Sequence, residues 1–408
     1  MQNKYRKIYQ TLLDHLPRKE FAIITGARQT GKTTLIEQLK QEFDKVKQEN
    51  YMLSAEDPVL LKALNEHPEN IFQFIPQPEN KRIILFIDEI QYLENPSNFL
   101  KLLFDKYKGN LKIYATGSSA FYIDKKFNDS LAGRKRLFQL NTLNFEEFLN
   151  FKTGDKKIIN ELGIIRSDKN YISLERKKIE YYFSEFLTFG GYPEVVLATS
   201  TEDKLLILKE IWQSYLKRDI SDSRIKNENK FYSLLKILAH QSGNLLNIHE
   251  LANTLQMSVT SVENYIYVLR KSFHISLVRP FYKNIRKELT KMPKVYFNDL
   301  GFRNIILNSF NPVQDKIDKG EIIENYVFQR LVDLHEIDNL KYWRTTSGNE
   351  IDFVVSTSYE KGYAIETKFN SAAFKEKKYQ KFTENYPAYP LSVRAYISES
   401  NEDNILGL

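Results

Sequence analysis

The feature that most constrains the fold is an eight-residue segment, residues 26–33, with the sequence Gly-Ala-Arg-Gln-Thr-Gly-Lys-Thr. It matches the pattern G-x-x-x-x-G-K-[S/T] at every fixed position. A short apolar run, residues 21–25, precedes it, and residues 33–41 follow it with leucine and isoleucine at helical spacing. Glycines let backbone N–H groups turn inward around phosphate oxygens, and the helix N-terminus adds the positive end of its dipole. The segment therefore predicts a phosphate-binding loop between a strand and a helix.

Two side chains of this loop have predicted roles in holding a nucleotide. Lys32 is expected to reach the β- and γ-phosphates, and the Thr33 hydroxyl is expected to ligate Mg²⁺. The loop thus predicts ATP and Mg²⁺ as cofactors. The residues expected to hold the nucleotide are Gly26, Ala27, Arg28, Gln29, Thr30, Gly31, Lys32, Thr33 and Thr34.

A second apolar run, residues 83–87, ends in two acids, Asp88 and Glu89. A continuous apolar run is typical of a strand that is buried on both faces. Asp88 is expected to hold the Mg²⁺, and Glu89 to orient or deprotonate the attacking water. The alternative is a strand that simply ends in a polar turn, and the neighbouring phosphate-binding loop disfavours it.

Two further positions are candidates for contacts with a transferring phosphoryl group. The third strand, residues 111–115, ends in hydroxyl-bearing residues, among which Ser118 is the preferred catalytic candidate and Thr116 the second. A plain turn is the alternative there. Arg134 is the candidate arginine for stabilising phosphoryl charge, in cis or from a neighbouring subunit. Its alternative is a solvated basic loop.

Length and composition set limits on the whole chain. With 408 residues, two to four domains are expected. Lysine and arginine total 59 against 52 acidic residues, and this excess is compatible with a nucleic-acid partner without establishing one. The absence of cysteine excludes disulfides, thiolate zinc sites and cysteine nucleophiles. Residues 1–17 lack the apolar core of a signal peptide, and no run approaches membrane-spanning length, so we expect no membrane partner and a cytoplasmic location.

Two helical patterns in the middle of the chain predict a DNA-binding element. Residues 248–255 and 259–271 each carry an apolar face, and a short turn joins them. This is the helix-turn-helix pattern, and the alternating residues 274–282 that follow it are typical of a wing strand. DNA is therefore the expected partner, and a winged helix used only for packing between subunits is the alternative. The polar residues expected on the outer face and near the wing are Thr260, Ser261, Asn264, Tyr267, Lys271, Arg279 and Lys283.

A third group of polar residues lies near the C-terminus. Glu324 lies on a predicted helix, residues 321–334, and Asp352 and Glu366 lie on two predicted strands that a hairpin would bring side by side. Residues 366 and 368 point to one face of a strand, so Glu366 and Lys368 are both expected to face Asp352. The carboxylates would hold Mg²⁺, and Lys368 would activate or orient a water against a phosphodiester. The pattern resembles the D…E-x-K core of restriction-endonuclease-like nucleases, with Glu324 as a supplementary acid. An exposed hairpin, or a nuclease-like fold that does not cleave, are the alternatives.

Together these segments resemble AAA-type P-loop ATPases of a bacterial and archaeal family that carries a C-terminal domain of unknown function. The resemblance implies an α/β architecture: a P-loop core with a parallel sheet, a helical and winged-helix middle, and a C-terminal α/β restriction-endonuclease-like domain. The corresponding domain boundaries are residues 1–140, 141–230, 231–315 and 316–408. The segments that carry the resemblance are residues 26–34, 86–91, 116–119, 131–134, 143–148, 190–194 and 294–300.

Two functional hypotheses follow from these predictions. In the first, ATP hydrolysis is coupled to DNA binding or processing, with metal-dependent cleavage at the C-terminal acids. In the second, the chain is a nucleotide-driven switch or scaffold that binds protein partners and has a non-cleaving nuclease-like domain. A homo-oligomer is compatible with either hypothesis.

Overall fold

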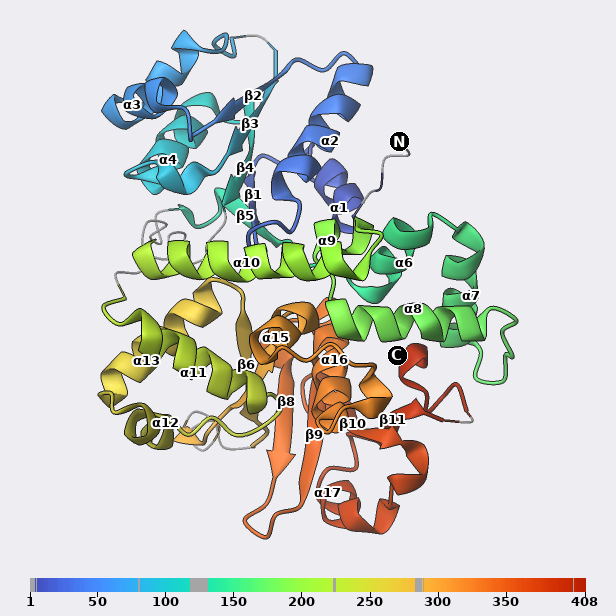
Figure 1. The fold of residues 1–408 in the computed structure, drawn as a ribbon. Helices are drawn as coiled ribbons and strands as arrows, with labels where there is room; N and C mark the ends of the chain where they lie inside the picture. The colour runs from blue at the N-terminus through green and yellow to red at the C-terminus, as the bar shows by residue number, and fades with distance from the viewer. Residues whose placement is uncertain are drawn as a thin grey trace. The chain divides into compact units, whose positions relative to one another are not determined.

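The computed structural model describes residues 4, 6–79, 81–117, 131–222, 225–282, 288, 290–398 and 400–408 (Figure 1). The chain forms two compact units. The first consists of Met1–Thr142 with Lys271–Phe273, and the second of Leu143–Arg270 with His274–Leu408. The expected boundary at residues 140/141 lies close to this division, whereas the expected boundaries at 230/231 and 315/316 fall inside the second unit.

The first unit contains a five-stranded sheet in which every neighbouring pair of strands is parallel. The order across the sheet is β2-β3-β4-β1-β5. The sequence predicts β1, β3 and β4 from their apolar runs, but it does not predict β2 or β5. The strands are β1 (Phe21–Thr25), β2 (Asn50–Ser54), β3 (Ile83–Asp88), β4 (Leu111–Gly117) and β5 (Lys135–Gln139).

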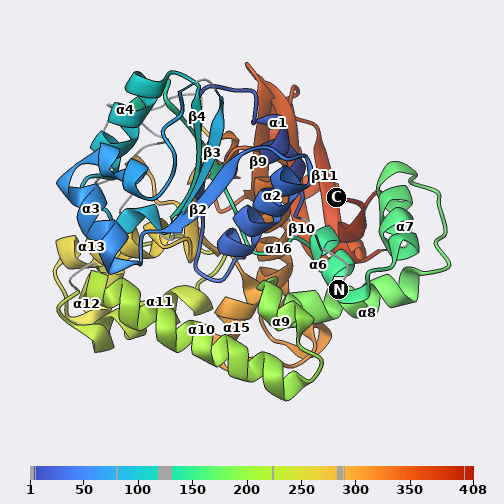
Figure 2. The ribbon, with the colours of Figure 1, turned by 90° about the horizontal axis from the view of Figure 1, so that it is seen from above.

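Helices cover both faces of this sheet (Figure 2). The odd-numbered apolar residues of β1 and β3 pack in one core with α3 and α4, and the even-numbered ones pack in another core with α1 and α2. Both faces of the central strands are therefore buried, which explains why their sequences are apolar throughout. The helices are α1 (Ile8–Asp14), α2 (Lys32–Lys45), α3 (Pro58–Glu66) and α4 (Pro96–Tyr107).

The second unit begins with a helical region. The helices α8 and α15 approach closely because α15 carries Gly301, where a Cβ atom would lie 2.0 Å from the carbonyl oxygen of Phe189. The helices of this unit are α6 (Phe145–Thr153), α7 (Lys156–Ser167), α8 (Arg176–Phe189), α9 (Pro193–Leu197), α10 (Thr201–Asp222), α11 (Glu228–His240), α12 (Ile248–Leu255), α13 (Val259–Lys271), α15 (Leu300–Leu307), α16 (Lys319–Leu334) and α17 (Gln380–Asn385).

The helices α12 and α13 have the bounds that the sequence predicts. Gln256 has a φ of 49° and ends α12, and the Ser258 hydroxyl accepts a hydrogen bond from the Ser261 backbone N–H at 3.1 Å in the first turn of α13. Val262, Ile266 and Leu269 are buried, as their spacing predicts. The helix pair is therefore held by an apolar core, and its polar face is left outside.

The sheet of the second unit has six strands in the order β11-β10-β9-β8-β6-β7. The pairs β6–β7, β8–β9 and β9–β10 are antiparallel, and β6–β8 and β10–β11 are parallel. The strand after the helix pair, β6, therefore belongs to the same sheet as the C-terminal strands. The strands are β6 (Ile275–Pro280), β7 (Lys294–Phe297), β8 (Leu340–Arg344), β9 (Glu350–Ser358), β10 (Lys361–Asn370) and β11 (Leu391–Ile397).

Within the described residues, no helix combines the length and apolar character needed to cross a membrane.

Candidate functional site

The phosphate-binding loop follows β1 directly and leads into α2. Gly26 lies so close to the backbone that a Cβ atom there would be 2.1 Å from the carbonyl oxygen of Leu140. Gly31, with a φ of 89°, occupies the left-handed region at the start of α2. The Thr30 hydroxyl donates to the Ala27 carbonyl oxygen at 2.9 Å and holds the loop closed on itself. Both glycines of the motif are thus required by the backbone path.

Lys32 is buried inside this loop, with 5% of its surface exposed. Its ammonium group donates to the carbonyl oxygens of Gly26 at 3.1 Å and Ala27 at 2.7 Å. Burial lowers the pKa of Lys32 to about 8, although the charge of Glu89 acts in the opposite direction. The carbonyl oxygens carry no full charge, so an anionic phosphate would stabilise the ammonium form strongly.

A chain of hydrogen bonds joins the carboxyl ends of the neighbouring strands at this loop. The Thr33 hydroxyl donates to Asp88 Oδ2 at 2.8 Å, and the Thr116 hydroxyl donates to Asp88 Oδ1. The Glu89 backbone N–H donates to Thr116 Oγ1 at 3.0 Å. Parallel strands end at one common edge, so the two acids after β3 lie beside the loop after β1.

Glu89 is held in an unusual backbone conformation. Its φ of 55° lies in the left-handed region, which for a residue other than glycine costs on the order of 1–3 kcal/mol. The Gln91 side-chain amide donates to Glu89 Oε2. Gln91 is a site residue that the sequence does not single out, because a glutamine near a strand end has no distinctive spacing.

The residues at this edge fit a Mg²⁺ ion. Mg²⁺ prefers hard oxygen ligands, and the Thr33 hydroxyl and the Asp88 carboxylate already lie within hydrogen-bond distance of each other. They lie beside Lys32, which is expected to contact the phosphates that share such an ion. Thr33 and Asp88 would hold the ion when a nucleotide is bound.

The Thr116 hydroxyl lies between the two acids, and its predicted contact with the γ-phosphate or the water stays a prediction. Thr116 is fully buried, and its hydroxyl is used in contacts with Asp88 and with the Glu89 backbone. These contacts position the two acids. Ser118, the preferred candidate, lies outside the described residues.

Arg134 is far from the loop in its own chain. Its carbonyl oxygen accepts from the Phe21 N–H at 2.9 Å, so it lies at the amino end of β1, whereas the loop follows the carboxyl end. Its guanidinium donates to Asp105 on α4 at 2.7 and 3.2 Å. Five strand residues of about 3.3 Å each separate the two edges, so Arg134 does not reach the phosphates of its own loop. A role on a neighbouring copy stays a prediction.

In the second unit, the hairpin of β9 and β10 places the predicted acids on facing strands. Ile365 faces Phe353 at the end of the paired register, and Glu366 and Asp352 are the residues that come next on the two strands. Asp352 Oδ2 accepts from the backbone N–H and the hydroxyl of Thr367 at 2.8 and 2.6 Å.

Glu366 has its own set of neighbours on β10 and beyond. Its Oε1 accepts from the Tyr379 hydroxyl at 2.7 Å and from the Lys368 ammonium. Its Oε2 is buried and has no hydrogen-bond partner in the described part of the chain. Glu366 and Lys368 thus contact each other on one face of β10.

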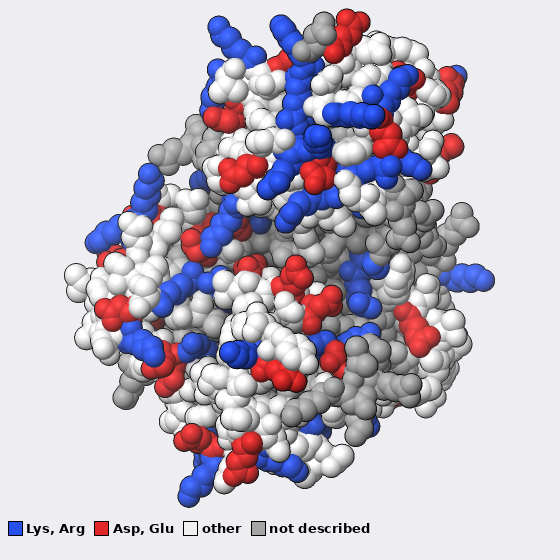
Figure 3. Space-filling model, turned by 180° about the vertical axis from the view of Figure 1, so that it is seen from behind, with Lys and Arg blue, Asp and Glu red and all other residues white. Residues whose placement is uncertain are grey.

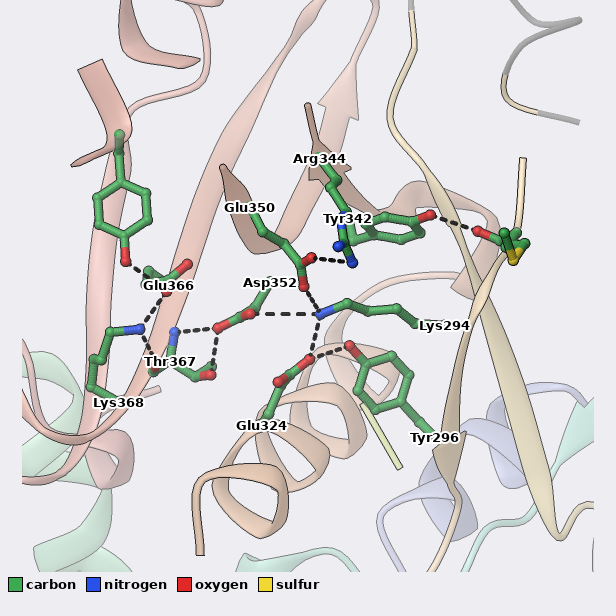
Figure 4. A network of polar contacts seen from close by, with 12 residues as sticks. Lys294, Tyr296, Glu324, Tyr342, Arg344, Glu350, Asp352, Glu366, Thr367 and Lys368 are labelled. Atoms are coloured by element: carbon green, nitrogen blue, oxygen red, sulfur yellow. Dashed lines mark hydrogen bonds and ion pairs between the residues drawn. The ribbon is translucent and has the colours of Figure 1, made fainter. Parts of the chain in front are cut away.

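The centre of this region is a residue that the sequence did not single out, Lys294 on β7. Its ammonium lies 2.9 Å from Glu324 Oε1, 2.5 Å from Glu350 Oε1 and 3.7 Å from Asp352 Oδ1 (Figure 4). Its side chain is 3% exposed. The contacts join residues 30 to 58 positions apart in sequence, so no local pattern points to them.

The predicted Mg²⁺ site of Glu324, Asp352 and Glu366 is not formed. Across the ranges that the structure describes, no three Asp, Glu or His side chains are arranged to hold a metal ion. The physical reason is visible in Figure 4, where the Lys294 ammonium lies between Glu324 and Asp352 and Thr367 takes the other oxygen of Asp352. The three acids do not fit a shared divalent cation.

Two of these acids have raised pKa values. Burial, and then the charge of Asp352, raise the pKa of Glu366 to about 7. The same two causes, in the same order, raise the pKa of Glu324 to about 7. Around Glu366 the opposing groups are Lys368 and the Tyr379 hydroxyl.

Three family models match successive parts of the chain. Residues 18–149 match a family described as "AAA domain", residues 180–312 a "Domain of unknown function (DUF8612)", and residues 319–406 a "Domain of unknown function (DUF4143)". The expected AAA-type core followed by a C-terminal domain of unknown function is therefore confirmed at this level. The matches leave the expected winged helix and endonuclease-like fold untested.

Relatives that align along most of the chain carry the name "Uncharacterized protein". A protein of Methanocaldococcus jannaschii is 28% identical over 340 residues, which cover 82% of this chain and 71% of that protein. A protein of Mycobacterium tuberculosis is 24% identical over 363 residues, covering 87% and 72%. Alignments of this length include residues of both units.

Solved structures show only distant likeness. Thermotoga maritima RuvB, a Holliday junction branch migration motor, has a TM-score of 0.33 and 15% identity and covers 70% of this chain and 95% of its own. Aquifex aeolicus DnaA bound to AMPPCP has a TM-score of 0.30 and 19% identity and covers 67% and 90%. Scores of this size do not establish a shared fold over the aligned length.

The raised pKa of Glu366 predicts a loss of stability at neutral and higher pH. The folded state keeps the proton up to about pH 7, whereas the unfolded chain loses it near the usual pKa of 4.5, so the free energy of unfolding falls as pH rises between these values. A shift of this size corresponds to about 3 kcal/mol. In urea unfolding at pH 5 and pH 8, Glu366→Gln should lose less stability than the wild type. The exposed Glu376→Gln serves as control, and equal losses in Glu366→Gln and the wild type would contradict the assignment.

Proposed function

We propose that the first unit binds ATP with Mg²⁺ and hydrolyses it. The observation that carries this proposal is the hydrogen-bond chain from Thr33 through Asp88 and Thr116 to Glu89, beside the buried Lys32. It brings a phosphate-binding cation, a pair of metal-compatible oxygens and a second carboxylate to one edge of a parallel sheet. The match of residues 18–149 to the AAA domain family supports the same function.

Each residue of this edge has a chemical task in the proposal. The backbone of the loop, residues 26–34, surrounds the phosphates, and Lys32 neutralises their charge. Thr33 and Asp88 would hold Mg²⁺, which would neutralise phosphate charge when bound. Glu89 orients the attacking water and accepts its proton as the oxygen bonds to the γ-phosphorus and the bond to the β–γ bridging oxygen breaks. Thr116 is a positioning residue for both acids.

Glu89→Gln and Thr116→Val test this proposal by separating binding from hydrolysis. Glu89→Gln should bind ATP normally and slow its hydrolysis by about 10²–10⁴-fold, because an amide is a poor base. Thr116→Val removes a buried hydrogen bond to a carboxylate, worth about 1.5–3 kcal/mol, so turnover should fall by roughly 10–100-fold. Thr11→Val, an exposed helical position, is the matched control. Wild-type turnover in Glu89→Gln or Thr116→Val would rule out the role assigned to that residue.

A nucleic-acid partner is proposed for the helix pair of the second unit. The outer side of α13 carries the polar residues Thr260 and Asn264, both exposed, with Ser261, Tyr267 and Lys271 partly exposed. Such side chains contact phosphates and base edges in helix-turn-helix proteins. On the face drawn in Figure 3, positive side chains are interspersed with negative ones, so the overall charge distribution there adds little to the argument.

A binding function for protein partners is the second candidate, and one observation favours it. The predicted wing strand β6 has both of its edges paired, with β7 on one side and β8 on the other. It is therefore part of a larger sheet and is less available as a free wing than in an isolated winged helix. Under this second candidate function, ATP binding and hydrolysis change the surface by which the second unit binds a protein partner. Lys283, near the predicted wing tip, lies outside the described residues.

DNA affinity and its salt dependence distinguish the two candidates. If α13 and β6 contact DNA, the double substitution Lys271→Glu with Arg279→Glu should weaken binding and reduce the slope of log affinity against log salt by about two. Lys209→Glu with Lys236→Glu, at exposed positions of α10 and α11, makes the same charge change and should have a smaller effect. Unchanged binding by the first pair would place the contact elsewhere. Absence of binding by the wild type at low salt, with no DNA effect on ATP turnover, would favour protein partners.

A further inference from the structure

The C-terminal segment contains a largely buried acidic cluster, which we define as Glu324, Glu350 and Asp352. The three carboxylates come from α16 and β9, and their side chains are 14%, 25% and 12% exposed. They lie around one ammonium group, that of Lys294 (Figure 4). Buried carboxylates require a cation or hydrogen-bond donors, because removal from water destabilises their charged forms. The cation here belongs to the protein itself.

Five of the six carboxylate oxygens of the cluster have partners among the described residues. Each of the three acids directs one oxygen to Lys294. The oxygen of Glu324 that contacts Lys294 also accepts from the Tyr296 hydroxyl at 2.6 Å. A Mg²⁺ ion requires near-octahedral oxygen ligands at about 2.0–2.1 Å. These oxygens instead surround an ammonium group, those of Glu324 and Glu350 at 2.9 and 2.5 Å and that of Asp352 at 3.7 Å.

The remaining oxygens of Glu350 and Asp352 have donors of their own. Glu350 Oε2 lies 3.2 Å from the Arg344 guanidinium, and Asp352 Oδ2 accepts from Thr367. The three acids therefore form ion pairs with two basic residues, Lys294 and Arg344. A divalent ion added to this set would place two further positive charges directly against a buried ammonium, which is unfavourable at such short range.

Lys294 is held as a cation by its surroundings. Burial alone would lower its pKa, but the charges of Glu324, Asp352 and Glu350 outweigh burial and raise the pKa well above the usual value. Lys294 lies in the region that matches one family of unknown function, whereas the three acids lie in the region that matches the other. The ammonium thus joins β7 to α16 and β9 across the boundary between the two regions.

We propose that the Lys294 ammonium is the permanent cation of the acidic cluster and takes the position that a divalent metal ion would need. The C-terminal segment then binds no Mg²⁺ or Mn²⁺ and does not cleave DNA by metal-dependent hydrolysis. This inference goes beyond ATP hydrolysis and is independent of it, because the residues belong to different units.

Thermal unfolding of the nucleotide-free full chain in EDTA, Mg²⁺ and Mn²⁺ tests the proposal. The wild type should unfold at the same temperature in all three. Lys294→Met, which keeps the length of the side chain without its charge, should unfold at a clearly lower temperature in EDTA, and Mn²⁺ should restore part of the loss by binding to the vacated carboxylates. Lys294→Arg is the conservative control that keeps the charge. Asp352→Asn identifies any metal effect that arises elsewhere, because such an effect persists in that variant.

Several outcomes would overturn the proposal. One is metal-induced stabilisation of the wild type that is lost in Asp352→Asn or in Glu366→Gln. Another is metal-dependent cleavage of plasmid DNA that is lost in Lys368→Ala. A Lys294→Met chain as stable as the wild type, or one that Mn²⁺ fails to restore, would also contradict it. If Lys294→Met does not fold, the wild-type titration with its Asp352→Asn control decides the question alone. None of these readouts depends on ATP turnover, so a failure here leaves the proposed ATPase function untouched.

Discussion

The hydrogen bonds of Asp88 are the interaction on which the proposed chemistry depends. One carboxylate oxygen accepts from Thr33 at the start of α2, and the other accepts from Thr116 at the end of β4. The contact exists only because β1, β3 and β4 are parallel neighbours whose carboxyl ends share an edge. The apolar residues that alternate between two cores keep these strands in that arrangement. The parallel strand order therefore accounts both for the burial of the sheet and for the position of Asp88 beside Thr33.

Two buried lysines, Lys32 and Lys294, have pKa values shifted in opposite directions because their neighbours differ in charge. Lys32 contacts neutral carbonyl oxygens, and burial lowers its pKa to about 8. Its charge is incompletely compensated, so an anion such as a phosphate is a favourable addition. Lys294 contacts three carboxylates, and its pKa is raised. Its charge is already compensated within the protein, and the site has no comparable affinity for a further ion.

The sequence predicts those parts of the fold that depend on local patterns. The runs that become β1 and β3, the loop between β1 and α2, and the helices α12 and α13 all carry complete signals within a few residues of one another. The strands β2 and β5 escape prediction because they lie at the sheet edges, where β2 is only partly buried and β5 carries exposed polar residues. An edge strand has one unpaired side and needs less apolar sequence.

The sites follow the same division. Asp88 and Glu89 are predictable because they directly follow a buried strand, and parallel strands bring such ends together. Lys294 is not predictable, because its partners at 324, 350 and 352 come from elements that only the assembled sheet brings near it. For Arg134, the sequence does not show whether the residue lies at the amino or the carboxyl end of the parallel strands. It lies at the amino end of β1 and binds Asp105, away from the phosphate-binding loop.

The most direct measurement is ATP binding and turnover by the purified chain beside Lys32→Ala. Titration calorimetry with ATP and Mg²⁺ should give one binding site per chain in the wild type, with steady release of phosphate. Lys32→Ala removes the buried ammonium that is proposed to contact the β- and γ-phosphates, so both binding and turnover should be lost or strongly reduced. Its thermal unfolding should show that the chain remains folded. A folded Lys32→Ala variant that binds and hydrolyses ATP as the wild type does would contradict the account.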